Sequence, residues 1–211
     1  MRVGADEAGK GPVLGSMFAA AVRAPAAAIP DGVADSKRLR PARREALDAA
    51  LRGDDRVAVG VAEVPVSRID DPETDMNTLT VAAQAEALGA VVREGDQALV
   101  DAGDADAARF GRRVADRLDG VAVTPEHRAD ERYPVVAAAS VVAKVARDAH
   151  VASLADEYGD VGSGYPSDPA TRAFLREFVR ETGTLPACAR ASWSTCSDLL
   201  AAAEQSALDE F

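Results

Sequence analysis

The chain has 211 residues, of which 47% are hydrophobic and 4% aromatic, and its formal net charge is -11. This length and apolar content support one domain, or a domain with a small appendage. Because Met1–Ala8 is polar and charged and no run reaches about 18 apolar residues, we expect neither a signal peptide nor a membrane span, and a soluble cytoplasmic protein.

Strand and helix patterns alternate through the first half of the chain. A glycine-rich turn, Gly9–Pro12, separates the first two apolar runs, and Pro41 and Gly53 flank the first helix pattern at the positions these residues favour. We expect strands over Arg2–Ala5, Val13–Val22, Arg56–Val64, Gln97–Val100 and Gly120–Thr124, and helices over Pro41–Leu51, Asp75–Arg93 and Ala105–Leu118.

From Pro134 onward the pattern is helical. We expect helices over Val135–Tyr158, Pro169–Thr182 and Ser192–Ser206, the last with Ser192 as its N-cap. The chain is therefore expected to form an α/β body over residues 1–160 and a C-terminal helical region over 161–211, together one structural unit. Cys188 and Cys196 match no zinc-site spacing and are expected to remain thiols in a reducing compartment.

The segment Gly4–Pro12 holds two adjacent acids, Asp6 and Glu7, before a glycine turn. Gly4, Gly9 and Lys10 fit the start of a phosphate-binding P-loop, but Gly11 follows where that motif needs Ser or Thr, and two carboxylates would face the phosphates. A strand that ends in adjacent acids is the better interpretation. Such neighbours point to opposite faces of a strand, unless it bends there. A solvated acidic turn is the alternative.

Two more acids occupy positions where sites are built. Asp101 follows the apolar run Ala98–Val100, at the end of an expected strand. Asp130 comes just before the long alanine-rich helix. Taken singly, each could be an ordinary cap or turn residue.

Five segments follow one another along the chain: Gly4–Gly15, Asp35–Leu39, Met76–Leu79, Leu99–Asp101 and Ala129–Asp148. Together they resemble segments of ribonuclease HII, and the last one resembles that family's second signature in its archaeal-like form. The resemblance covers about residues 2 to 180. It implies a ribonuclease H fold, a mixed sheet flanked by helices with a C-terminal helical appendage, and active-site carboxylates at Asp6, Glu7, Asp101 and Asp130. It also implies cleavage of RNA in RNA–DNA hybrids and 5′ of single ribonucleotides in duplex DNA.

The chemistry of the four acids agrees with this implication. Two divalent cations can activate water and stabilise the leaving oxygen of a phosphodiester, and Mg²⁺ or Mn²⁺ prefers oxygen ligands. Four close carboxylates also repel one another unless a cation is bound, so some of their pKa values should be raised. With only His127 and His150 in the chain, a histidine-based zinc site is hard to build.

The resemblance also assigns substrate contacts. It implies that residues 1–160 form the catalytic body and that the C-terminal helical region, 161–211, contacts the substrate. The turn Gly9-Lys10-Gly11 would read the ribonucleotide, with Lys10 where many members have Arg, and Tyr165 would contact the ribose–deoxyribose junction. Ser140, Lys144 and Arg147 share a helix face that would meet the nucleic-acid backbone, although ordinary surface residues would look the same. Lys37, Arg38, Arg40, Arg43 and Arg44 form a local basic patch suited to phosphates.

The acidic balance by itself argues against a nucleic-acid partner, since proteins that bind nucleic acid are usually basic. Only three lysines accompany 21 arginines, a composition typical of a salt-adapted, halophilic proteome. A local basic groove can coexist with an acidic surface, so we expect activity that tolerates or requires high salt. We expect a monomer, and the last residues, Ala207–Phe211, are too weak a pattern to predict docking on a sliding clamp.

Two alternatives remain at this stage. A type 3 ribonuclease H is disfavoured because that class usually carries an additional N-terminal domain. A non-catalytic hybrid-binding protein is disfavoured because binding alone needs no set of four acids.

Overall fold

A computed structural model describes residues 1–35 and 39–209. Ser36, Lys37 and Arg38, which belong to the expected basic patch and to one family-like segment, lie outside the described residues, as do Glu210 and Phe211. Within the described part, no helix is long and apolar enough to cross a membrane.

The chain forms two compact units. The first contains Met1–Lys10, Met17–Val64 and Asp75–Asp148, and the second contains Gly11–Ser16, Pro65–Thr74 and Ala149–Phe211. Each unit therefore combines segments that are distant in the sequence. This division does not test the expected boundary near residue 160, which stays a prediction.

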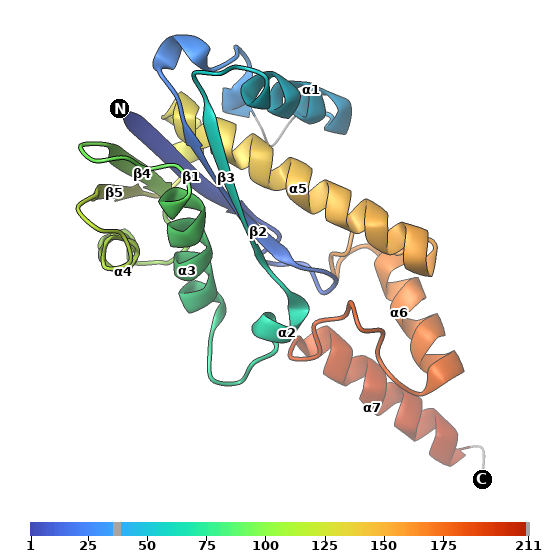
Figure 1. Cartoon of the computed structure of the whole chain (residues 1–211). Helices are drawn as coiled ribbons and strands as arrows, with labels where there is room; N and C mark the ends of the chain where they lie inside the picture. The colour runs from blue at the N-terminus through green and yellow to red at the C-terminus, as the bar shows by residue number, and fades with distance from the viewer. Residues whose placement is uncertain (36–38, 210–211) are drawn as a thin grey trace. The chain divides into compact units, whose positions relative to one another are not determined.

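The first unit holds a five-stranded mixed sheet in the order β3-β2-β1-β4-β5 (Figure 1). β1 pairs antiparallel with β2 and parallel with β4, β2 pairs antiparallel with β3, and β4 pairs parallel with β5. The expected α/β fold with a mixed sheet is therefore confirmed. The strands are β1 (Arg2–Ala8), β2 (Met17–Arg23), β3 (Ala58–Val64), β4 (Gln97–Asp101) and β5 (Ala122–Glu126).

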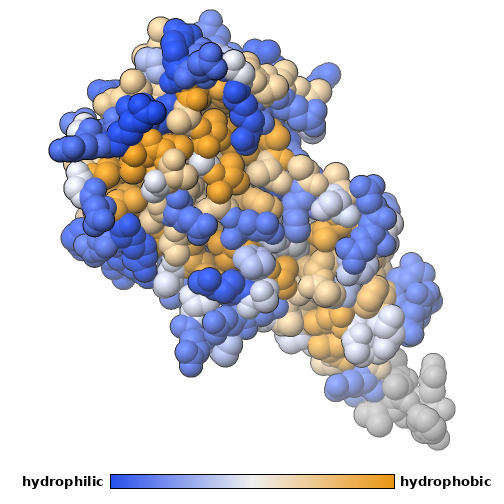
Figure 2. All heavy atoms as spheres, in the orientation of Figure 1, coloured by the Kyte–Doolittle hydropathy of each residue, from blue (hydrophilic) through white to orange (hydrophobic). Residues whose placement is uncertain are grey.

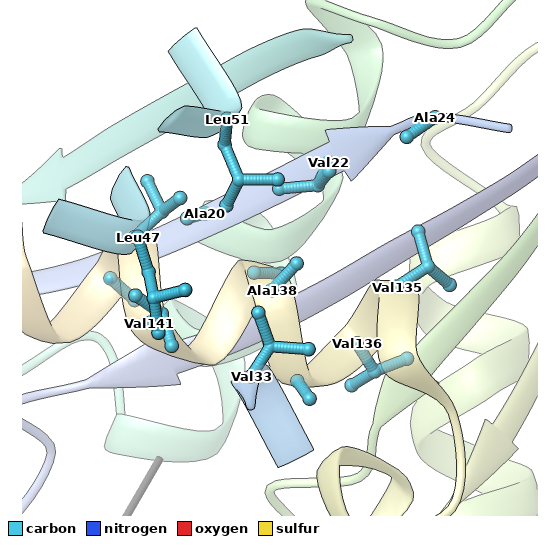
Figure 3. Close-up of a cluster of buried hydrophobic side chains, with 14 of the residues drawn as sticks. Ala20, Val22, Ala24, Val33, Leu47, Leu51, Val135, Val136, Ala138 and Val141 are labelled. Atoms are coloured by element: carbon cyan, nitrogen blue, oxygen red, sulfur yellow. The ribbon is translucent and has the colours of Figure 1, made fainter. Parts of the chain in front are cut away.

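Helices cover both faces of this sheet. On one face, α1 (Pro41–Arg52) and the first part of α5 (Pro134–Tyr158) pack on alternate residues of β2, and Figure 3 shows Leu47 and Leu51 of α1 beside Ala20 and Val22. On the other face lie α3 (Met76–Gly89) and α4 (Ala107–Ala115). Burial of such Leu and Val side chains stabilises the fold by about 1.5–3 kcal/mol each.

Small residues let β1 approach α5 closely. A β-carbon on Gly4 would lie 2.4 Å from the carbonyl carbon of Val135, so only glycine fits there. The run Val136–Ala139 at the start of α5 is fully buried. This close packing aligns the start of α5 with the strand that carries Asp6 and Glu7.

The second unit is mainly helical. It contains α2 (Val66–Ile69), the rest of α5, α6 (Pro169–Thr182) and α7 (Ser194–Asp209). Its core packs Val13 and Leu14 against Leu175, Cys188 and Cys196. Both cysteines are buried free thiols, as expected.

Several expected boundaries are wrong, and local hydrogen bonds explain why. Val13–Ser16 is not strand, because its backbone bonds to Gly164 and Cys188 and β2 begins only at Met17. Ser192 does not cap α7, since its N–H and hydroxyl both donate to Asp70, and the helix begins at Ser194. Helix α3 ends at Gly89 rather than Arg93, and α4 begins after its N-cap Asp106.

Polar residues cover much of the visible surface, with apolar residues between them (Figure 2). The large hydrophobic side chains that are exposed in the described part include Val61 and Tyr165. Of these, Tyr165 is a residue to which the sequence assigned a substrate contact.

Candidate active site

Asp6 and Glu7 lie inside β1, which continues to Ala8 before the glycine turn. A P-loop is therefore wrong, because both acids belong to the strand and Gly9, at φ 88°, begins the turn after it. As neighbours on a strand, the two acids point to opposite faces. Asp6 points to α5, where Ser140 donates a hydrogen bond to it, and Glu7 points to α3, where Gln84 donates to it at 2.6 Å.

Asp101 is the last residue of β4, which lies beside β1. The strands are parallel there and Ala5 pairs with Val100, so Asp101 reaches the same end of the sheet as Asp6. Its Oδ1 accepts a hydrogen bond of 2.7 Å from the N–H of Ala129. Asp101 is thereby fixed against the segment that contains Asp130.

Asp130 lies in a 3-10 helix, Ala129–Glu131, just before α5. Its side chain is buried, and it directly follows the residue that donates to Asp101. The turn before it needs a left-handed residue, Arg128 at φ 58°. The structure thus places Asp130 next to a partner of Asp101, at the start of the helix that carries Ser140.

The pKa values show that the acids of β1 and β4 influence one another. Burial, followed by the charges of Glu7 and Asp101, raises the pKa of Asp6 well above its usual range. Burial also raises the pKa of Glu7 to about 7, with Asp101 adding to the shift and Gln84 and Lys10 opposing it. The structure therefore brings Asp6, Glu7 and Asp101 together as one electrostatic group.

This donor set suits a hard divalent cation. Buried carboxylates that raise one another's pKa values are relieved by positive charge, and all the candidate ligand atoms are oxygen. Among the described residues, no three His, Cys, Asp or Glu side chains form a cluster already closed around a metal position. A cation held by three or more of these carboxylates would therefore need their side chains to move closer together.

Two of the three lysines lie beside these acids. The ammonium group of Lys10 donates to Asn77 at 2.9 Å and to the carbonyl of Gly103, and its charge lowers the pKa of Glu7. The ammonium group of Lys144 donates to Ser140, and its charge lowers the pKa of Asp6. One positive charge thus lies on each side of the acidic group.

Other expected substrate residues lie in varied settings. Ser140 has no exposed surface and lies beneath Asp6, which favours an orienting role, so its contact with nucleic acid stays a prediction. Arg147 lies 3.7 Å from Asp148, which also binds Arg44 of the expected basic patch. Gly11 and Tyr165 belong to the second unit, where a β-carbon on Gly11 would lie 3.8 Å from Cε1 of Tyr165.

Sequence reasoning missed three residues that shape this site. The amide of Gln84 donates both to Glu7 and, at 3.0 Å, to the carbonyl of Asp101, so it links β1 to β4. Asn77 binds Lys10, and a β-carbon on Gly103 would lie 2.8 Å from Oε1 of Glu7. One signal was available, since Gln84 is the polar residue within the otherwise apolar stretch Val81–Ala85.

Comparisons with known proteins point in one direction. The family model described as Ribonuclease HII matches residues 3–196. A ribonuclease HII of the halophilic archaeon Haloarcula marismortui is 68% identical, over 100% of both chains. The structure of the ribonuclease H2 from Pyrococcus horikoshii has a TM-score of 0.88 and 35% identity, covering 97% of this chain and 99% of that one. A PCNA:RNase HII complex from Archaeoglobus fulgidus gives a TM-score of 0.84 and 37% identity, over 94% and 96%.

Proposed function

The chain belongs to the ribonuclease HII family, and we propose that it cuts RNA strands by metal-assisted hydrolysis at Asp6, Glu7, Asp101 and Asp130. Membership makes it an endoribonuclease of the ribonuclease H type. The finer proposal is cleavage of RNA–DNA hybrids and 5′ of single ribonucleotides in duplex DNA, leaving 3′-hydroxyl and 5′-phosphate ends. The observation that carries it is the group of buried and half-buried acids on β1 and β4, which raise the pKa values of Asp6 and Glu7.

The four carboxylates would hold Mg²⁺ or Mn²⁺. When bound, two such cations supply an activated water and stabilise the leaving oxygen. Glu7, with a pKa near 7, must lose its proton to act as a ligand at neutral pH. Lys10 and Lys144 favour the ionised forms of Glu7 and Asp6, which keeps the ligands available.

Neighbouring residues orient the carboxylates. Gln84 fixes Glu7 from the α3 side, Ser140 fixes Asp6 from the α5 side, and the N–H of Ala129 fixes Asp101. Such supporting hydrogen bonds hold ligands in one orientation and limit the rearrangement needed for binding.

Recognition of the ribose would fall to the turn Gly9-Lys10-Gly11 and to Tyr165. Glycines let the backbone approach the sugar closely, and the 2′-hydroxyl distinguishes RNA from DNA. The ammonium group of Lys10 is already bound to Asn77 and Gly103, which supports reading by the backbone rather than by this side chain. Tyr165 is 42% exposed, so its ring is accessible to a nucleotide.

The proposal extends to surroundings and partners. We place the protein in the cytoplasm as a monomer. The Archaeoglobus fulgidus protein was solved with PCNA, and we include contact with such a clamp in the proposal. Co-elution of this chain with its own clamp would support that contact, and separate elution at micromolar concentration would refute it.

Cleavage of a labelled duplex with one ribonucleotide tests the function. We expect cutting on the 5′ side of the ribose with Mg²⁺ or Mn²⁺, none with excess chelator, and products that carry a 3′-hydroxyl. Cleavage of long hybrids but not of this duplex would restrict the activity to the coarser ribonuclease H reaction. Binding without cleavage under all metal conditions would favour a non-catalytic hybrid-binding protein.

Replacement of Tyr165 by alanine tests the junction contact. Because the ring would pack against the sugar at the ribose–deoxyribose step, we expect the variant to lose about tenfold or more of its kcat/KM on single-ribonucleotide duplexes. Loss on long hybrids should be smaller, and steady-state kinetics on both substrates measures the difference. Equal losses would remove the junction role.

A further inference from the structure

A groove in the second unit lies between α6 and α7. Pro166, Arg172 and Arg176 line it from the α6 side, and Thr195, Asp198 and Leu199 line it from α7. Arg172 and Arg176 are one helical turn apart, so both side chains emerge on the same face of α6. None of these residues belongs to the acidic group of the first unit.

The charge of this groove is unlike that of its surroundings. The sequence of the second unit contains thirteen Asp and Glu residues, five Arg and no Lys. On α6, Arg180 pairs with Glu177 at 3.2 Å. Arg190, which lies after this helix, is buried and donates a hydrogen bond to the carbonyl of Gly15. The guanidinium groups of Arg172 and Arg176, by contrast, form no hydrogen bond or ion pair with a described residue, although Asp198 lines the same groove.

This arrangement does not serve the stability of α6. Like charges one turn apart repel each other, and an acidic unit offers many ways to pair an arginine. The two guanidinium groups nevertheless line a groove, and neither pairs with a carboxylate of the described residues, although Asp198 belongs to the same lining. Planar guanidinium groups bind phosphate oxygens with two parallel hydrogen bonds, which a screened ammonium group cannot do.

The groove is adjacent in the chain to Tyr165, the residue proposed to contact the ribose–deoxyribose junction. Pro166 follows Tyr165 directly, and a β-carbon on Gly11 would lie 3.8 Å from Cε1 of Tyr165. Two hydrogen bonds hold the loop that contains Tyr165 and Pro166. The N–H of Ser163 donates to Asp168 at 2.6 Å, and the N–H of Gly164 donates to the hydroxyl of Thr171 at 2.9 Å. Gly11, Tyr165 and the arginine pair therefore follow one another within a single unit.

We propose that the α6–α7 groove is a phosphate-binding site for the nucleic-acid backbone, with Arg172 and Arg176 as its ligands. It would bind the duplex beyond the ribonucleotide, on the side to which Pro166 leads. Thr195 offers a hydroxyl donor at the edge, and Asp198 leaves the groove with a net charge of one positive unit. This inference rests on the proposed function, since it takes duplex DNA as the ligand.

The test compares the double variant R172Q/R176Q with the wild type. Binding to an all-DNA duplex, which lacks the ribose to be cut, is measured by fluorescence anisotropy from about 0.3 M to about 3 M KCl. We expect Kd to rise about tenfold at the low end, and the slope of log Kd against log salt to fall by about one for each phosphate that the variant no longer binds. On the single-ribonucleotide duplex, KM should rise while kcat stays within about twofold.

Arg180→Gln is the control, because it removes one positive charge from the same helix at a paired position. Its Kd and salt slope should equal those of the wild type. R172K/R176K should recover the salt slope but only part of the affinity, since lysine keeps the charge and loses the bidentate geometry.

A double variant that melts like the wild type and binds DNA with the wild-type Kd and slope overturns the site. If R180Q weakens binding as much as R172Q/R176Q, the effect is one of total charge and the groove is not a site. Failure of the wild type to cleave ribonucleotide-containing duplex would instead defeat the proposed function, so the two failures are distinguishable.

Discussion

At the scale of single residues, three of the four candidate carboxylates each accept a hydrogen bond from a different neighbour. Asp101 accepts from a backbone N–H, Asp6 from Ser140 and Glu7 from Gln84. The supporting groups come from three separate segments of the first unit. The site can therefore be dissected by changing a ligand or by changing only its support.

Asp101→Asn and Asp130→Asn change two of the four proposed ligands. Each variant keeps the size of the side chain but loses the charge that a divalent cation needs. We expect cleavage to fall by about a thousandfold or more, while the melting temperature stays within a few degrees. Initial rates and thermal unfolding measure both quantities, and near-normal turnover by either variant would show that the assignment is wrong.

Gln84→Leu changes only the support of Glu7. The variant removes the amide that links Glu7 to the carbonyl of Asp101, so Glu7 loses its fixed orientation and its pKa rises further. We expect about a 10–100-fold loss of activity that higher Mn²⁺ concentrations partly restore. Titration of activity against metal concentration measures this. An unchanged metal dependence would mean that Gln84 has a packing role alone.

At the scale of elements, local patterns predicted most helices and strands but not their ends. Pro169–Thr182 agrees with α6 at both ends because Asp168 caps it, Pro169 begins it and Gly183 ends it within the same short segment. The start of α7 could not be predicted, because Ser192 is held by Asp70, more than a hundred residues away. Tertiary hydrogen bonds decided the boundary there.

The site was predictable to a similar degree. Asp6, Glu7 and Asp101 could be named from strand ends and from the family resemblance, and the structure places them together. Gln84 and Gly103 could not be assigned, since their importance depends on the distance between α3, β1 and the loop after β4. Only the folded chain supplies that distance. The catalytic roles themselves stay predictions.

Asp96 joins three strands at the end of the sheet opposite the acids. It precedes β4, its Oδ2 lies 2.6 Å from Nε of Arg23 at the end of β2, and its Oδ1 lies 2.9 Å from the amino group of Met1 before β1. Burial opposes its ionisation, but the hydrogen bonds from Arg23, Met1 and the N–H of Arg93 outweigh burial and lower the pKa of Asp96.

Asp96→Asn should therefore destabilise the sheet. A buried charge pair that loses one partner costs about 3 kcal/mol, and urea unfolding at neutral pH measures it. Because the lowered pKa stabilises the fold only while Asp96 is ionised, the difference from wild type should shrink as pH falls below about 4. Asp54→Asn, in an exposed pair with Arg56, is the control and should change nothing measurable. A pH-independent difference for Asp96→Asn would contradict this explanation.

At the scale of the whole molecule, charge is the dominant property. A net charge of -11 repels itself in dilute buffer, and salt screens that repulsion. We expect the free energy of unfolding and the cleavage rate to hold or rise from about 0.1 M to about 2 M KCl. Denaturation curves and initial rates across this range measure both. A sharp optimum in dilute buffer, with loss of folding in molar salt, would refute the salt adaptation.

Acidic character and a nucleic-acid ligand are compatible in this chain because positive charge is placed locally. Lys10 and Lys144 flank the acids of the first unit, and Arg172 and Arg176 face the groove of the second. Since salt weakens phosphate contacts, we expect recognition to rely strongly on hydrogen bonds and on the proposed metal site. Cleavage as proposed therefore depends on the carboxylates binding cations.

Anomalous diffraction from crystals soaked in Mn²⁺ tests that dependence most directly. We expect Mn²⁺ peaks within ligand distance, about 2.0–2.3 Å, of oxygens from Asp6, Glu7, Asp101 and Asp130. The peaks should weaken or vanish in Asp101→Asn crystals. Mn²⁺ peaks elsewhere on the protein, with none at these four side chains in a wild-type crystal that cleaves its substrate, would contradict the account.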